Sequence, residues 1–141
     1  MKVIIKMFID FNKHSYIITD ISYNDDNHNG ASINHIIIKT NGSKSFSLIA
    51  EGDCCSMSVF HKWENCPFEN LIGKVITKCE GIELPEDFKF EEDDYYGCND
   101  CISPHLYEFS FKDSEETFKF MLVNYSNGYY DGWITFDLID S

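Results

Sequence analysis

The stretch HLYEFSFKDSEETFKFMLVNYSNGYYDGWITFDLI, residues 105–139, decides the fold class. Apolar side chains alternate with polar ones in two segments that flank the polar turn at residues 113–116, and these side chains are Tyr107, Phe109, Phe111, Phe118, Phe120 and Leu122. A second turn is predicted at Ser126-Asn127-Gly128, and residues 133–139 then resume as a strand. Alternation with period two puts one set of side chains on one face of a sheet. The pattern predicts three successive antiparallel strands that share one buried face.

The N-terminal half shows the same hairpin features. Apolar, β-branched runs at residues 3–11 and 16–21 surround a polar stretch and predict one hairpin. Residues 33–40 and 46–50 surround Asn41-Gly42, the dipeptide best suited to the positive φ angles of a tight turn, and predict another. We expect a mainly β fold, arranged as a single antiparallel sheet, a small sandwich or a partly open barrel of hairpins.

The middle of the chain supplies two further strands, one helix and one loop. Residues 56–63 and 74–84 are predicted strands. Between them, Pro67 suits a helix start and Gly73 a helix exit, so we expect one short helix near residues 67–72. Residues 85–100, which are rich in acidic side chains, are predicted to form a loop. No internal repeat or linker divides the chain, and we expect residues 1–141 to form one β-rich domain.

The charge is strongly negative and has an unusual composition. The 11 basic residues are all lysines, against 24 Asp and Glu, which gives a net charge of -13. An acidic surface repels a phosphate backbone. A chain without arginine also lacks the guanidinium group, whose paired hydrogen bonds recognise phosphates and guanine edges. The sequence therefore argues against direct binding of nucleic acid.

The N-terminal residues bear on location. Apolar residues 1–11 are interrupted by Lys2, Lys6 and Asp10, so they predict neither a secretory signal nor a membrane span. We expect a protein that is not secreted, resides in a reducing cytoplasm and keeps its six cysteines as thiols or metal ligands.

A possible metal site lies in the acidic loop and the strand after it. Cys98, Cys101 and His105 have the spacing C-x2-C-x3-H, which can present two thiolates and an imidazole to one tetrahedral zinc ion. Cys54 or Cys55 is the candidate fourth ligand. Ordinary reduced cysteines and a redox pair are the alternatives, so the cofactor is either absent or one structural zinc.

An aromatic cluster follows the second predicted turn. Asn127, Gly128, Tyr129, Tyr130 and Trp133 lie in one short stretch whose rigid amphipathic side chains are typical of recognition surfaces. The alternative is that Tyr125 and Trp133 belong to the core and Asn127-Gly128 only makes the turn.

Three stretches, taken in order, resemble a family of small uncharacterised phage and viral proteins. They are Gly52-Asp53-Cys54-Cys55-Ser56, Asn70-Leu71-Ile72-Gly73-Lys74-Val75-Ile76, and Ser126-Asn127-Gly128-Tyr129-Tyr130 followed by Ile134, Phe136 and Leu138. The resemblance covers about residues 33–139. It implies a viral source, a β-rich fold and a location in the cytoplasm of an infected cell, and it adds Asp53, Cys54 and Cys55 to the candidate binding residues. The CxxC at residues 98–101 lies outside the family pattern.

Three functional hypotheses follow. The first is a non-enzymatic viral accessory protein that binds a host protein and interferes with a defence or nucleic-acid-handling function, since no complete catalytic motif is present. The second is a binder that sequesters a small molecule or nucleotide on Tyr129, Tyr130 or Trp133. The third is a zinc- or thiol-dependent enzyme. Exposed sheet edges also allow a homodimer.

Overall fold

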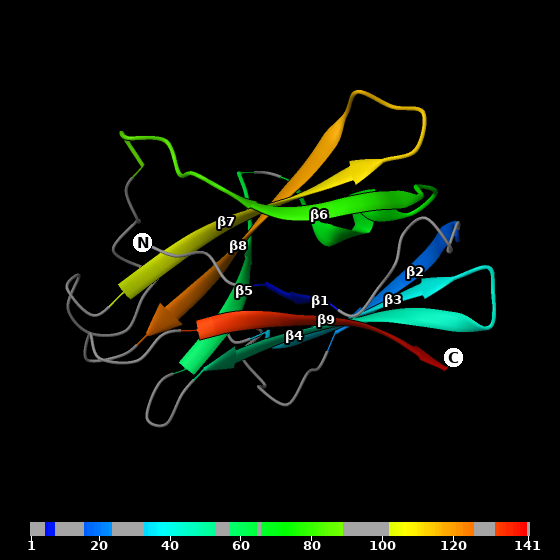
Figure 1. The fold of residues 1–141 in the computed structure, drawn as a ribbon, viewed down its shortest axis with the longest axis horizontal. Helices are drawn as coiled ribbons and strands as arrows, with labels where there is room; N and C mark the ends of the chain where they lie inside the picture. Colours follow the sequence, from blue (N-terminus) through cyan, green and yellow to red (C-terminus); the bar gives the residue numbers. More distant parts are fainter. Residues whose placement is uncertain are drawn as a thin grey trace.

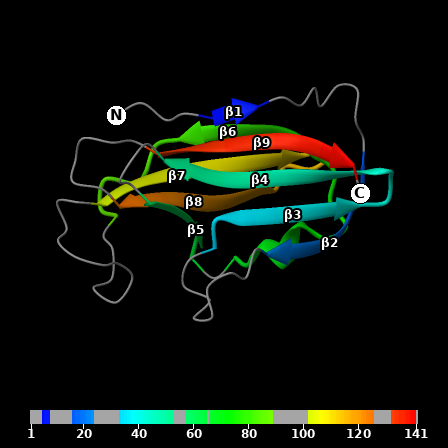
Figure 2. The ribbon, with the colours of Figure 1, turned by 90° about the horizontal axis from the view of Figure 1, so that it is seen from below.

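The computed structural model describes residues 5–7, 16–23, 33–52, 57–64, 66–88, 102–125 and 132–140. They form two sheets that pack face to face as a sandwich (Figure 1). The five-stranded sheet has the order β1 (Ile5–Met7), β9 (Gly132–Asp140), β4 (Lys44–Gly52), β3 (His35–Thr40) and β2 (Ile18–Tyr23). The four-stranded sheet has the order β5 (Met57–Lys62), β8 (Thr117–Tyr125), β7 (Ile102–Phe111) and β6 (Ile76–Ile82). Figure 2 shows the five-stranded sheet in front of the four-stranded one.

These sheets confirm the predicted mainly β class and select the sandwich among the expected arrangements. Among the described strands, every pair is antiparallel except that of β1 with β9, which is parallel. The single-sheet alternative is wrong, because the apolar faces of two separate sheets meet in one core.

The C-terminal strands are confirmed as strands, but their predicted pairing is partly wrong. β7 and β8 form the expected hairpin, in which Phe109 lies opposite Phe118 and Tyr107 opposite Phe120. β9 does not continue this meander, because it pairs with β4 and β1 in the other sheet. The connection between β8 and β9 therefore crosses from one sheet to the other.

Aromatic rings fill the space between the sheets. Phe109 on β7 has its ring centroid 5.1 Å from that of Phe120 on β8 and 5.6 Å from that of Phe136 on β9. All three side chains are fully buried. Burial also raises the pKa of the Tyr107 phenol and of the Cys79 thiol in this core. Both groups are therefore held in their neutral forms.

The predicted N-terminal hairpin is wrong. β1 pairs with β9, and in this pairing Lys6 lies opposite Thr135. β2 pairs with β3 and not with β1. The local sequence pattern identified apolar strands correctly, but a parallel pairing between the two ends of the chain leaves no local turn signal.

The hairpin of β3 and β4 is confirmed, although its turn is not the predicted one. Pairing ends at Lys39 and Ser45, and Gly42 does not have the positive φ that a tight Asn-Gly turn requires. Gly42 is required for another reason: a Cβ atom at this position would lie 2.6 Å from Cδ1 of the Tyr16 ring.

The predicted short helix is present as the 3-10 helix η1 (Phe68–Leu71). Pro67 precedes it in an extended conformation. Gly73 lies two residues after its end and has a φ of 90°, which favours glycine. Phe68 and Leu71 point into the core, where the Phe68 ring lies 5.4 Å from that of Phe118. Backbone hydrogen bonds between Ile18 and residues 73–74 tie the end of η1 to β2.

The outer face of the four-stranded sheet is also apolar. Val59, Leu106, Met121 and Val123 form a second buried cluster there. Phe88 covers it and stacks on Trp63 with ring centroids 5.6 Å apart. Within the described part of the chain, no helix is long and apolar enough to span a membrane.

Candidate functional site at one end of the sandwich

The strand register places the ends of several predicted site segments next to one another. Gly52 pairs with Gly132 in the five-stranded sheet, and Met57 pairs with Tyr125 in the four-stranded sheet. Segments 53–56 and 126–131 each join these two sheets, so both begin and end on paired residues. Ile102, which follows segment 89–101, also pairs with Tyr125. These strand ends lie together at the left of Figure 1, and we call this the loop end.

Most of the predicted site residues lie outside the described residues. These are Asp53, Cys54, Cys55, Cys98, Cys101, Asn127, Gly128, Tyr129 and Tyr130. Their roles stay predictions, and so do the zinc site and the redox alternative. The two predicted site residues that the structure describes are Trp133 and His105, and both lie close to the loop end.

Trp133 is on the outer face of the five-stranded sheet, not in the core. Ile134 and Phe136 alternate with it and point inward. The indole nitrogen Nε1 of Trp133 donates a hydrogen bond of 3.2 Å to Oε2 of Glu51, and the Thr135 hydroxyl donates to the same oxygen. These bonds hold the half-buried indole in one orientation. The side chain therefore loses less conformational entropy when a partner binds it.

His105 points into the sandwich, where it belongs to a group of buried polar residues. It lies opposite Leu122 and shares the inner face of its sheet with Asn124 and Ser58. The Asn124 side-chain amide donates a 2.9 Å hydrogen bond to the Ser58 hydroxyl. Within the described part of the chain, Oδ1 of Asn124 accepts no hydrogen bond although it is fully buried. Burying polar groups in this way costs stability where a hydrogen bond is left unmade.

Gly132 forms the other side of this cluster. A Cβ atom at position 132 would overlap the Ser58 hydroxyl and lie 2.8 Å from Nδ2 of Asn124. Only glycine therefore lets the two sheets approach at this point. Alternation along β8 would have placed Asn124 inward, but no feature of the sequence marked Ser58 or Gly132 as its neighbours.

The described residues alone hold no metal-binding group: they include no cluster of three His, Cys, Asp or Glu side chains. A zinc site with His105 would need the cysteines of segment 89–101. On the outer face of the five-stranded sheet, the His35 imidazole lies 2.9 Å from the Ser47 hydroxyl. The neighbouring Asp137 carboxylate accepts a hydrogen bond from the Leu138 backbone.

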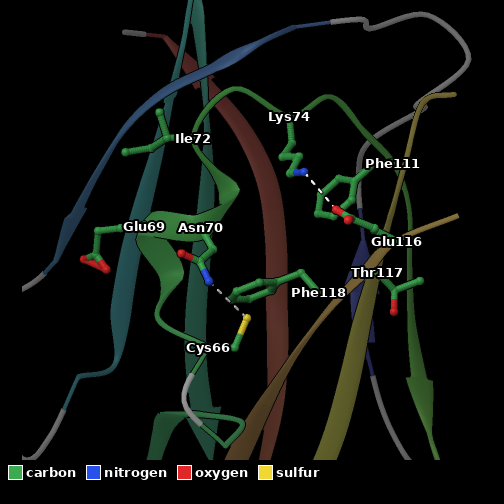
Figure 3. Close-up of a pocket in the computed structure, with 9 residues that line it drawn as sticks. All are labelled: Cys66, Glu69, Asn70, Ile72, Lys74, Phe111, Glu116, Thr117 and Phe118. Atoms are coloured by element: carbon green, nitrogen blue, oxygen red, sulfur yellow. Dashed lines mark hydrogen bonds and ion pairs between the residues drawn. The ribbon is translucent and has the colours of Figure 1, made fainter. Parts of the chain in front are cut away.

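A pocket that the sequence did not predict lies at the opposite end of the sandwich (Figure 3). It has a volume of about 440 Å³ and lies between η1 and the tip of the β7–β8 hairpin. Phe111 and Phe118 border it but are almost completely buried, and the Lys74 ammonium lies 3.2 Å from Oε2 of Glu116. Asn70 and Cys66 border it from the η1 side, where Nδ2 of Asn70 lies 3.5 Å from Sγ of Cys66.

Comparison with known proteins finds a viral relative. The chain is 36% identical over 90 residues to an uncharacterised protein of Acanthamoeba polyphaga mimivirus. The match covers 62% of this chain and 64% of that protein, so the chain spans less than two thirds of the relative's length. No protein-family model matches the chain. No solved structure matches it significantly. The similarity supports a viral origin among proteins of uncharacterised function, and the three stretches of the resemblance stay predictions.

Proposed function

We propose that this chain is a viral accessory protein that binds a host protein through the loop end and acts without catalysis. The observation that carries the proposal is the pairing of Gly52 with Gly132 and of Met57 with Tyr125. It brings the ends of segments 53–56 and 126–131 to one end of a rigid double sheet. Loops gathered at one end of a β-sandwich are a common arrangement for recognition, because the sheets hold their ends in place.

Two further features support a protein partner. The Trp133 indole is fixed beside this end by Glu51, and tryptophan and tyrosine are enriched among the residues that dominate binding energies. The net charge of -13 favours a partner with a basic surface, for which electrostatic attraction raises the rate of association. A basic host protein that handles nucleic acid has the matching charge.

The test is a binding measurement with the full chain and a host-cell lysate. We expect saturable capture of a host protein that weakens as salt is raised and that is lost in the double variant Tyr129→Ala/Tyr130→Ala. The matched control is Ile17→Ala, which removes an exposed apolar side chain near the opposite end. Absence of any saturable partner at low and moderate salt contradicts the proposal, and so does binding that only the control variant abolishes.

A structural zinc at the loop end remains a second proposal. Its support is the inward position of His105 three residues after Ile102, at the end where segments 53–56 and 89–101 meet the sheets. Metal analysis of chain purified without chelator tests it: one zinc per chain supports the site, and a ratio near zero rules it out.

A further inference from the structure

Among the described strands, the edges of the two sheets are β1, β2, β5 and β6, and β6 is the least protected of them. β1 is only three residues long. Backbone hydrogen bonds from Phe60 of β5 to Ile33, and between Ile18 of β2 and residues 73–74, occupy part of the open sides of those strands. β6, near the top of Figure 2, pairs with β7 on one side and makes no backbone hydrogen bond to any described residue on the other. Its outer N–H and C=O groups are therefore available to a further strand.

The side chains of β6 show that this edge is open to solvent. Thr77, Lys78 and Gly81 are exposed. Cys79 is buried in the core, so Lys78 and Glu80, its two neighbours, lie on the outer face of the sheet. They form an ion pair of 3.2 Å, and their side chains are 60% and 42% exposed. Thr77 is displaced as a bulge in the pairing with β7, so the regular part of the edge begins at Lys78.

The charges on this outer face indicate which strand can join the edge. Glu80 lies opposite Glu108 of β7, and Glu108 forms an ion pair of 3.3 Å with Lys119, which lies opposite it on β8. Like charges that lie opposite each other on neighbouring strands are destabilising, and opposite charges are stabilising. A joining strand is therefore favoured when it places a lysine opposite Glu80 and an acid opposite Lys78.

A second copy of β6 has this pattern. When two identical antiparallel strands pair about a two-fold axis, one residue lies opposite its own copy. With Cys79 on the axis, Lys78 of each chain lies opposite the partner's Glu80, and Thr77 lies opposite the partner's Gly81. With Lys78 or Glu80 on the axis, that residue faces its own charge. Electrostatics therefore selects the register that is centred on Cys79.

We propose that β6 pairs with β6 of a second copy of this chain, antiparallel and centred on Cys79, which joins the two four-stranded sheets into one continuous sheet. The contact is made by the backbone edge and by two Lys78–Glu80 pairs between the chains. The antiparallel arrangement turns the two loop ends in opposite directions, so the dimer does not depend on the function proposed there. One strand edge is a small interface, and we expect a dissociation constant on the order of 10–100 µM.

Sedimentation equilibrium of the full chain tests the dimer at concentrations from about 1 to 500 µM and at about 150 mM salt, which screens the long-range repulsion between two acidic chains. Lys78→Glu and Glu80→Lys each convert two attractive pairs into two repulsive ones. Each should raise the dissociation constant about 10-fold or more. The matched control is Lys39→Glu, an exposed position of β3 in the other sheet, which changes the net charge as Lys78→Glu does and should leave the dimer unchanged.

An equimolar mixture of the two single variants tests the register. The Lys78→Glu chain presents two acids and the Glu80→Lys chain two lysines, so every pair between the two chains is again opposite in charge. We expect a heterodimer at concentrations where each variant alone is monomeric, and we expect the double variant Lys78→Glu/Glu80→Lys to dimerise like the original chain. A chain that stays monomeric up to about 500 µM overturns the proposal. So does a dimer that neither charge reversal weakens, or a mixture that remains monomeric.

Discussion

Replacing Phe109 with alanine is expected to lower the free energy of unfolding by about 3–5 kcal/mol, the range observed when a buried phenylalanine is truncated. The Phe109 side chain is fully buried and contacts rings of both sheets, with centroids 5.1 Å away at Phe120 and 5.6 Å away at Phe136. Its loss leaves a cavity at the point where the two sheets meet. Denaturation by urea, followed by tryptophan fluorescence, measures the change.

The control for this prediction is Ile139→Ala. Ile139 is a large apolar residue of β9 that is 37% exposed, so its truncation should cost less than about 1 kcal/mol. A loss of similar size for both variants would show that residue 109 is not at the centre of the core.

Replacing Gly132 with alanine is expected to cost about 2–3 kcal/mol, because the new Cβ atom would overlap the Ser58 hydroxyl and crowd Nδ2 of Asn124. The neighbouring strands must move apart, which also strains the hydrogen bond between Asn124 and Ser58. Thermal or urea unfolding of the variant measures this loss.

A second substitution tests the cause. In the double variant Gly132→Ala/Ser58→Ala the overlapping hydroxyl is gone, so the two changes together should cost about 1 kcal/mol less than the sum of the two single changes. Strict additivity would contradict the close approach of β9 and β5 at the loop end.

The alternation of side chains predicted strands much better than it predicted their partners. Period two along β7 and β8 correctly gave the buried residues Phe109 and Phe120. In β9 the residue considered for the core was Trp133, whereas Phe136 is the buried one. It carried no information on which sheet receives β9, because an inward-facing side chain looks the same from either side of a sandwich. The turn at residues 126–128 favoured a hairpin, although the strands on its two sides belong to different sheets.

Contacts between residues that are far apart in the sequence explain the other wrong predictions. β1 is three residues long and pairs with the C-terminal strand, an interaction that no local pattern encodes. Gly42 was predicted from its turn dipeptide, yet its small size is needed beside the Tyr16 ring. Local sequence preferences therefore identified strand residues and the need for glycine at position 42. They gave the wrong cause for that glycine, because its turn does not require a positive φ.

For the candidate sites, too, the sequence indicated residues by their chemistry but not their positions in the fold. His105 and Trp133 were chosen for their chemistry, and the structure places the first inside the sandwich and the second on an outer face. Asn124 and Ser58 belong to strands that are far apart in sequence, and only their register brings them together. The ion pair of Lys74 with Glu116 likewise joins a segment after η1 to a hairpin turn, so the pocket could not be found from spacing.

The central claim is that the segments carrying the predicted site residues meet at one end of the sandwich. Nuclear Overhauser effects between backbone protons of the full chain test it most directly. We predict cross-strand contacts that link Gly52 with Gly132, Met57 with Tyr125, and Tyr125 with Ile102. Contacts that instead pair residues 117–125 with residues 132–140 as a continuous hairpin would contradict it.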